Sequence, residues 1–160
     1  MKYQIRPISS NEIPLLQDFL YEAIFQTDEH NLLPRSIIKL PEIEVYVKNF
    51  GQKDDNCLVA VDGEKIVGAV WTRILSDPVK GFGNIDNQTP EFAISLYKEY
   101  RGKGIGTQLM LNMLQLLKER GYTKTSLAVQ KDNYAVKMYK NVGFTIVNEN
   151  EQEYIMVHEL

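Results

Sequence analysis

The sequence contains little cysteine, little surplus charge and no long apolar run, and each shortage excludes a class of protein. One cysteine in 160 residues, Cys57, cannot form an internal disulfide or a multi-thiolate zinc site, so nothing calls for an oxidising compartment. A net charge of −3 at pH 7 excludes the strongly basic surface of a nucleic-acid-binding protein. No segment approaches the ~20 apolar residues that span a bilayer, and the N-terminal residues lack the apolar stretch of a secretory signal. We therefore expect a cytoplasmic protein without a nucleic-acid or membrane partner.

Metal ligands are scarce as well. The two histidines, His30 and His158, have no partners at the spacing of a metal site, so we predict no bound metal. Cys57 stands at the start of an expected strand, where a lone cysteine is typical of a small buried side chain.

What the chain does have is the composition of a folded globular protein. Hydrophobic residues make up 44% and charged residues 24% of its 160 positions, and both fractions are average for globular domains. A domain usually takes about 100–200 residues, so we predict a single domain over residues 1–160.

Hydrophobic spacing predicts strands alternating with helices. The spacing predicts helices over residues 9–26, 42–50, 104–120 and 133–142, and strands over residues 3–6, 57–61, 65–74, 92–97, 126–130, 144–147 and 154–158. Asp62-Gly63 between two of the strands is typical of a tight hairpin turn. This order indicates an α/β protein with a mixed sheet covered by helices on both faces.

The most informative segment lies between the strand at 92–97 and the helix that follows it. Gly102, Gly104 and Gly106 stand at alternate positions and lead directly into the helix. Glycine lets a backbone approach a ligand closely, and the unpaired N–H groups of a helix start attract phosphate. Two other phosphate motifs fail on spacing. The dinucleotide-binding motif needs a third glycine where Thr107 or Leu109 stands, and the Walker motif needs its second glycine, followed by lysine, where Thr107 stands. The alternative is a flexible turn without a ligand.

Charge is distributed unevenly around this segment. Residues 98–140 contain nine Lys and Arg against three acids, whereas the rest of the chain is acidic. A basic segment of this kind suits a polyanionic ligand, and Lys103, Lys137 and Lys140 are candidates to meet its phosphates. Solvated surface charge without a ligand is the alternative.

These residues resemble the GCN5-related N-acetyltransferase (GNAT) superfamily. The family signature Arg/Gln-x-x-Gly-x-Gly/Ala is similar to residues 101–106, and residues 94–100 are similar to the preceding strand and turn, although the frequent proline is Lys98 here. Residues 132–139 with Gly143-Phe144 are similar to a second family motif. Order and spacing agree across residues 55–148, and the first 54 residues fit the β-α-α opening more loosely.

The resemblance implies a fold and a donor. The fold is an α/β sheet of about six or seven mostly antiparallel strands with one splayed parallel pair, flanked by about four helices. The donor is acetyl-CoA, with its pyrophosphate on the backbone N–H groups of residues 102–106 and the Arg101 side chain, and its pantetheine arm against the strand at 94–96. The cofactor-binding residues implied in this way are Ile94, Ser95, Leu96, Arg101, Gly102, Lys103, Gly104, Ile105, Gly106, Thr107, Asn133 and Tyr139.

The resemblance also implies catalytic roles. An alkyl ammonium with a pKa of about 10.4 must lose a proton before it attacks, and Glu91 stands where many relatives carry a glutamate at a strand start, which makes it the leading base. Tyr139 takes the family position of the acid that protonates the departing thiolate of CoA. The Leu96 N–H is expected to meet the developing oxyanion. Either Asn133 or Asp132 fills the family's asparagine position, and either can cap the following helix.

The acceptor is expected to be a primary amine of a small molecule or peptide. Relatives shape the acceptor site from the loops that correspond to residues 26–36, 76–90 and 148–153. These loops carry the acids Asp28, Glu29, Glu149, Glu151 and Glu153, which would favour a cationic amine. An acyl-CoA-binding regulatory module without turnover is the alternative function, and a homodimer is common in relatives.

Overall fold

Seven strands of the described chain, residues 2–76 and 78–160 of this computed structural model, form one mixed sheet in the order β1-β2-β3-β4-β5-β7-β6. The strands are β1 (Gln4–Pro7), β2 (Asn56–Asp62), β3 (Lys65–Arg73), β4 (Glu91–Leu96), β5 (Lys124–Gln130), β6 (Thr145–Glu149) and β7 (Glu153–Glu159). All neighbours are antiparallel except β4 and β5. The predicted sheet with one parallel pair is confirmed.

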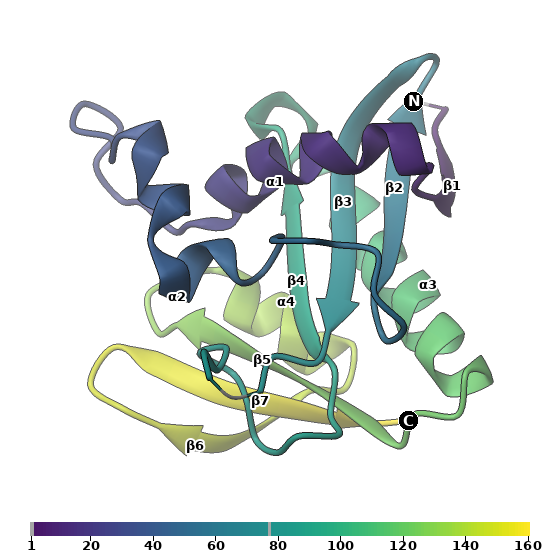
Figure 1. Cartoon of the computed structure of the whole chain (residues 1–160). Helices are drawn as coiled ribbons and strands as arrows, with labels where there is room; N and C mark the ends of the chain where they lie inside the picture. The colour runs from purple at the N-terminus through teal and green to yellow at the C-terminus, as the bar shows by residue number, and fades with distance from the viewer. Residues whose placement is uncertain (1, 77) are drawn as a thin grey trace.

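Helices cover the sheet on both faces (Figure 1). The α-helices of the described residues are α1 (Leu16–Ala23), α2 (Pro41–Glu44), α3 (Ile105–Glu119) and α4 (Ala135–Asn141), and the 3₁₀ helices are η1 (Ser10–Leu15), η2 (Arg35–Lys39) and η3 (Lys98–Tyr100). In Figure 1, α1 and α2 lie in front of the sheet, and α3 and α4 lie behind it. This arrangement matches the expected α/β fold with about four helices.

Each face of the sheet has its own hydrophobic core, because side chains alternate between the faces along every strand. Behind the sheet, Leu109 and Met113 of α3 are fully buried against β2, β3 and β5. In front, Phe19 of α1 packs on Trp71 of β3. Strand β4 therefore contributes to both cores and lies at the centre of the molecule.

The first two helices are shorter than the sequence predicts. The segment expected as one helix over 9–26 begins as η1, because Pro14 has no N–H to donate to an α-helical bond, and it ends at Ala23. The segment expected over 42–50 is α-helical only as far as Glu44. Beyond it, i−3 bonds donated by Tyr46 and Val47 are mixed with an i−4 bond donated by Lys48, and Asn49 ends the turn at φ 54°.

The parallel strands β4 and β5 separate after Glu91 and Ser126, and we call the gap between them beyond this pair the fork. Strands β4 and β5 pair only at Glu91↔Ser126, whereas every residue of β4 pairs with a residue of β3. N–H groups alternate in direction along a strand, and the N–H of Tyr97 points to β3, where it bonds to the Val67 carbonyl at 3.0 Å. Ile94 and Leu96 therefore direct their backbone groups into the fork, toward β5.

Candidate functional site

The glycine-rich turn leads from η3 into the first turn of α3. Gly102 has φ 73° and Gly104, the residue that caps α3, has φ 84°, a left-handed conformation that only glycine adopts easily. A Cβ placed on either residue would meet no atom within 4 Å. The backbone of the turn therefore faces open space, so a ligand can approach it closely.

The start of α3 supplies free hydrogen-bond donors to that space. The N–H of Gln108 donates the first helical bond, to the Gly104 carbonyl at 3.2 Å. The N–H groups of Ile105, Gly106 and Thr107 precede this bond and have no acceptor within the helix. Together with the positive end of a 15-residue helix that has no acid in its first turn, they form a site suited to a phosphate or diphosphate.

Arg101 is engaged by the protein itself. Its Nε donates to the Leu96 carbonyl at 3.0 Å, and its Nη2 lies 3.1 Å from Glu22 Oε2 in α1. This ion pair is partly exposed, with 36% and 27% of the two side chains accessible. A phosphate would therefore compete with Glu22 for the guanidinium, while the backbone N–H groups of the turn need no such exchange.

The three predicted residues of β4 face different ways. Ile94 and Leu96 pack toward the core behind the sheet. The Ser95 hydroxyl points to the front, is buried, and donates to the Phe19 carbonyl at 2.6 Å. In this structure the Ser95 side chain fastens α1 to β4, and the Ser95 backbone pairs with Ala69 of β3.

Tyr139 lies in α4, and this helix approaches the glycine turn through the preceding residue, Met138. Its neighbour Met138 reaches Gly106, where a Cβ would be 3.6 Å from the Met138 sulfur. The Tyr139 ring packs against Phe144 with centroids 6.0 Å apart, and 9% of the residue is exposed. Burial, with a smaller contribution from Tyr134, raises the pKa of this phenol, so Tyr139 carries its proton at neutral pH.

The structure shows how the start of α4 is capped. The Asn133 side chain accepts a hydrogen bond from the Ala135 N–H at 2.9 Å. Asn133 thus fulfils the capping role that the sequence left open between Asn133 and Asp132.

Glu91, the predicted base, is the first residue of β4 and is 3% exposed. Its Oε2 accepts hydrogen bonds from the Tyr46 hydroxyl and from the Gly83 N–H at 3.1 Å. Its Oε1 is buried and has no hydrogen-bond partner among the described residues. Burial raises the pKa of Glu91 to about 7, although the bonds from Tyr46 and Gly83 oppose the shift.

Several carboxylates of the surrounding loops are already paired. Glu29 lies 2.8 Å from Lys98, and Glu149 lies 3.6 Å from Lys131. Glu153 at the start of β7 has a pKa raised by burial. Glu153 therefore resembles Glu91 in that burial is the main cause of its raised pKa.

Tyr46, Gly81 and Gly83 were not among the sequence-predicted residues. Tyr46 stands 45 positions before Glu91, in a segment expected to be an ordinary helix, and no motif connects the two. The only sequence signal for the glycines is their place in a loop rich in Gly, Pro and Asn, which also describes an unstructured connection.

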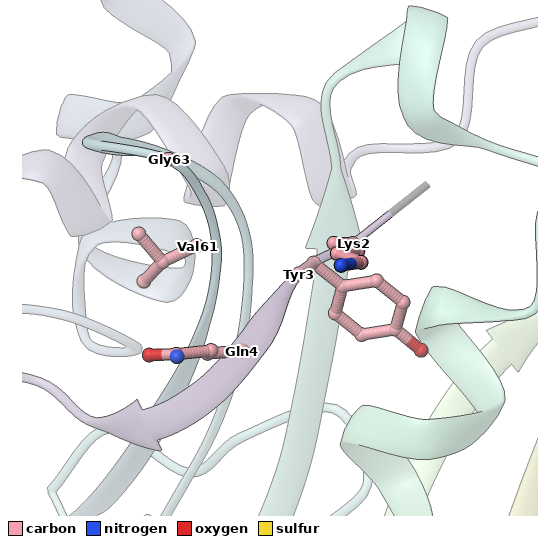
Figure 2. A pocket seen from close by; sticks show the side chains of 5 residues that line it. All are labelled: Lys2, Tyr3, Gln4, Val61 and Gly63. Atoms are coloured by element: carbon pink, nitrogen blue, oxygen red, sulfur yellow. The ribbon is translucent and has the colours of Figure 1, made fainter.

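A hollow of about 610 Å³ on the surface lies apart from these residues. It is lined by Lys2, Tyr3, Gln4, Val61 and Gly63, where β1 runs beside the β2–β3 turn (Figure 2). It contains none of the predicted site residues. No cluster of three or more His, Cys, Asp or Glu side chains able to hold a metal exists within residues 2–76 and 78–160.

Cys57 is expected to be chemically inert while the protein is folded. It is 6% exposed, and burial is the main cause that raises the pKa of its thiol, with a smaller effect from the charge of Glu12. We predict that a thiol-reactive disulfide reagent at pH 8 labels the folded protein at least about 100-fold more slowly than the protein unfolded in guanidinium. Rapid labelling of the folded protein would contradict this burial.

Comparison with known proteins gives consistent matches. The family model described as Acetyltransferase (GNAT) family matches residues 19–144. A mycothiol acetyltransferase of Corynebacterium aurimucosum is 33% identical over 86 residues, which are 53% of this chain and 26% of that protein. The uncharacterized N-acetyltransferase YobR of Bacillus subtilis is 33% identical over 136 residues, 84% of this chain and 47% of that protein. The chain thus spans about a quarter to a half of the length of these relatives.

Solved structures share the fold. The crystal structure of the PaiA N-acetyltransferase from Thermoplasma acidophilum in complex with coenzyme A has a TM-score of 0.70 and 21% sequence identity, and the match covers 100% of both chains. Within the part of the chain described here, none of the helices combines the length and apolarity that crossing a bilayer requires.

Proposed function

Because the chain belongs to the acetyltransferase (GNAT) family, as the match over residues 19–144 establishes, we propose that it transfers the acetyl group of acetyl-CoA to a primary amine of a small molecule or peptide. The observation that carries the proposal is the turn at Gly102 and Gly104, with positive φ angles and open space on its outer side. A structural relative that contains coenzyme A supports the same donor class.

The residues present suit the donor. The N–H groups of Ile105, Gly106 and Thr107 would hold the diphosphate, because they lack helical acceptors and lie at the positive end of α3. Backbone groups of Ile94 and Leu96 in the open fork would hold the pantetheine arm as a neighbouring strand does. When bound, the donor supplies an acetyl thioester whose sulfur leaves as a thiolate.

Two side chains would handle the protons of the reaction. Tyr139 holds a proton on its hydroxyl, because burial raises the pKa of the phenol, and it would donate this proton where negative charge develops on sulfur. Glu91, with a pKa of about 7, is partly ionised at neutral pH and would accept a proton from the acceptor ammonium. Its Oε1 lies against Gly81, so proton transfer requires residues 81–83 to move or a water molecule to enter beside it.

The charges near Glu91 favour a cationic acceptor. The negative charge of Glu153 contributes to the raised pKa of Glu91, so the two carboxyl groups are close enough to interact electrostatically. An ammonium group placed there would stabilise the ionised form of both. This supports an amine rather than a hydroxyl acceptor.

The direct test is an acetyl-CoA-dependent thiol-release assay against amines, polyamines, amino acids and peptides. We expect at least one amine to give release that requires both the protein and the amine, with a mass increase of one acetyl group on the acceptor. CoA binding by calorimetry without release for any acceptor would favour the regulatory module. Absence of both binding and release would contradict the donor site.

A further inference from the structure

We propose that Tyr46 is a positioning residue that holds the Glu91 carboxyl group in the orientation needed for proton transfer, with Oε1 as the proton-accepting atom. The inference deepens the proposed function and rests on it. Tyr46 follows α2 in the chain and reaches the start of β4 across the front of the sheet.

The two oxygens of Glu91 have different surroundings. Oε2 accepts hydrogen bonds from the Tyr46 hydroxyl and the Gly83 N–H, whereas Oε1 accepts none from residues 2–76 and 78–160. The Tyr46 hydroxyl in turn accepts a hydrogen bond from the Phe82 N–H at 2.9 Å. The hydroxyl proton is therefore directed to Oε2, and Oε1 is the oxygen left for a proton.

Tyr46 is itself firmly held. The Trp71 indole N–H donates to the Tyr46 carbonyl at 3.1 Å. Arg73 donates to the carbonyls of the flanking residues Val45 and Lys48, at 3.0 and 2.8 Å, and it forms a buried ion pair with Asp55. A residue whose backbone is fixed on both sides can place a hydroxyl group with little loss of freedom.

Gly81 limits the carboxyl group on its other side. A Cβ on Gly81 would lie 1.9 Å from Glu91 Oε1, and a Leu75 methyl group would be 2.9 Å away. The φ angle of Gly81 is not positive, so glycine is needed here because a side chain would collide with Glu91 and not because of the backbone conformation. Tyr46 thus contacts one oxygen of the Glu91 carboxyl group, Oε2, and Gly81 lies against the other, Oε1.

The charges around Glu91 define the direction of the expected pH effect. Glu153 of β7 faces the same space and opposes ionisation, while Arg73, the register partner of Glu91 on β3, is committed to Asp55 and to backbone carbonyls. The loop at 81–83 contributes backbone donors only. The hydrogen bond from Tyr46 lowers the pKa of Glu91, so its removal raises that pKa.

The test compares Tyr46→Phe with a matched control, Tyr122→Phe. Tyr122 also donates a hydrogen bond to a carboxylate, Asp54 at 2.5 Å, and neither of these two residues is hydrogen-bonded to Glu91, Tyr46 or residues 81–83. In Tyr46→Phe we expect the acidic limb of the kcat/KM profile to move up by about one pH unit, a typical effect of losing a hydrogen bond to a carboxylate. Activity at pH 6.5 should fall about tenfold and recover at high pH, because more base is then ionised. The control should keep the wild-type profile.

A second readout does not depend on turnover. NMR titration of ¹³C-labelled glutamate carboxyl groups should show the Glu91 resonance titrating at higher pH in Tyr46→Phe than in wild type or Tyr122→Phe. An unchanged Glu91 titration would overturn the proposal, even if activity fell. If the wild-type protein transferred no acetyl group, the proposed function would be contradicted. The NMR titration of Glu91 would still show whether Tyr46 affects the pKa of Glu91. Gly81→Ala, which displaces Oε1, serves as a second variant and should also move the Glu91 titration.

Discussion

Gly104→Val is expected to abolish measurable binding of coenzyme A. The φ angle of 84° is unfavourable for valine, and the new side chain would project into the open space beside the start of α3. Both effects act on the N–H groups proposed to hold the diphosphate. We expect isothermal titration calorimetry to show affinity reduced at least about 100-fold, equivalent to about 2.7 kcal/mol.

Gly121→Val is the matched control for this result. Gly121 follows the other end of α3, has φ 88°, and a Cβ there would also meet nothing within 4 Å. The two variants therefore carry a similar backbone penalty of roughly 1–2 kcal/mol, measurable as similar losses of Tm. Only Gly104→Val should lose coenzyme A. Equal loss of affinity in both would show that the effect is one of stability, and unchanged affinity in Gly104→Val would remove the basis of the donor site.

Tyr139→Phe is expected to lower kcat by about 100-fold with little change in KM, a typical contribution of a general acid. The substitution removes one oxygen atom and keeps the ring that packs on Phe144. No described residue is hydrogen-bonded to this hydroxyl, so its loss should leave Tm within a few degrees of wild type. Steady-state kinetics of the thiol-release reaction provides the measurement.

Two outcomes separate the roles of Tyr139. A fall in kcat with an unchanged Tm and KM supports proton donation at sulfur. Wild-type kcat and KM would show that Tyr139 serves the core alone. Tyr139→Leu, which removes the ring and leaves space beside Phe144, should additionally lower Tm, because it loses buried contacts.

The local features of the fold were predictable from the sequence because each has a local cause. Asp62-Gly63 predicted the hairpin between β2 and β3, and Gly63 has the positive φ, 63°, that such a turn requires. The helix expected over 104–120 is found at Ile105–Glu119, between glycines that stand at its two ends. Apolar spacing and glycine positions determine such elements without reference to distant parts of the chain.

The part of the site that the sequence could not predict depends on contacts between distant residues. Nothing near Tyr46 in the sequence indicates that its hydroxyl meets Glu91, because that contact arises only when the segment after α2 crosses the front of β3 and β4. Arg101 is a similar case, since its partner Glu22 lies 79 positions away in α1. Side-chain partners of this kind follow from tertiary packing, which a single sequence does not encode in any short pattern.

In the proposed function, the turn at residues 102–106 and the first N–H groups of α3 hold a diphosphate. The measurement that addresses it most directly is a crystal structure of the protein with coenzyme A. We expect diphosphate oxygens within about 3.2 Å of the N–H groups of Gly104 to Thr107, a normal hydrogen-bond distance. A diphosphate bound elsewhere, for example in the hollow beside Lys2 and Gly63, would contradict it.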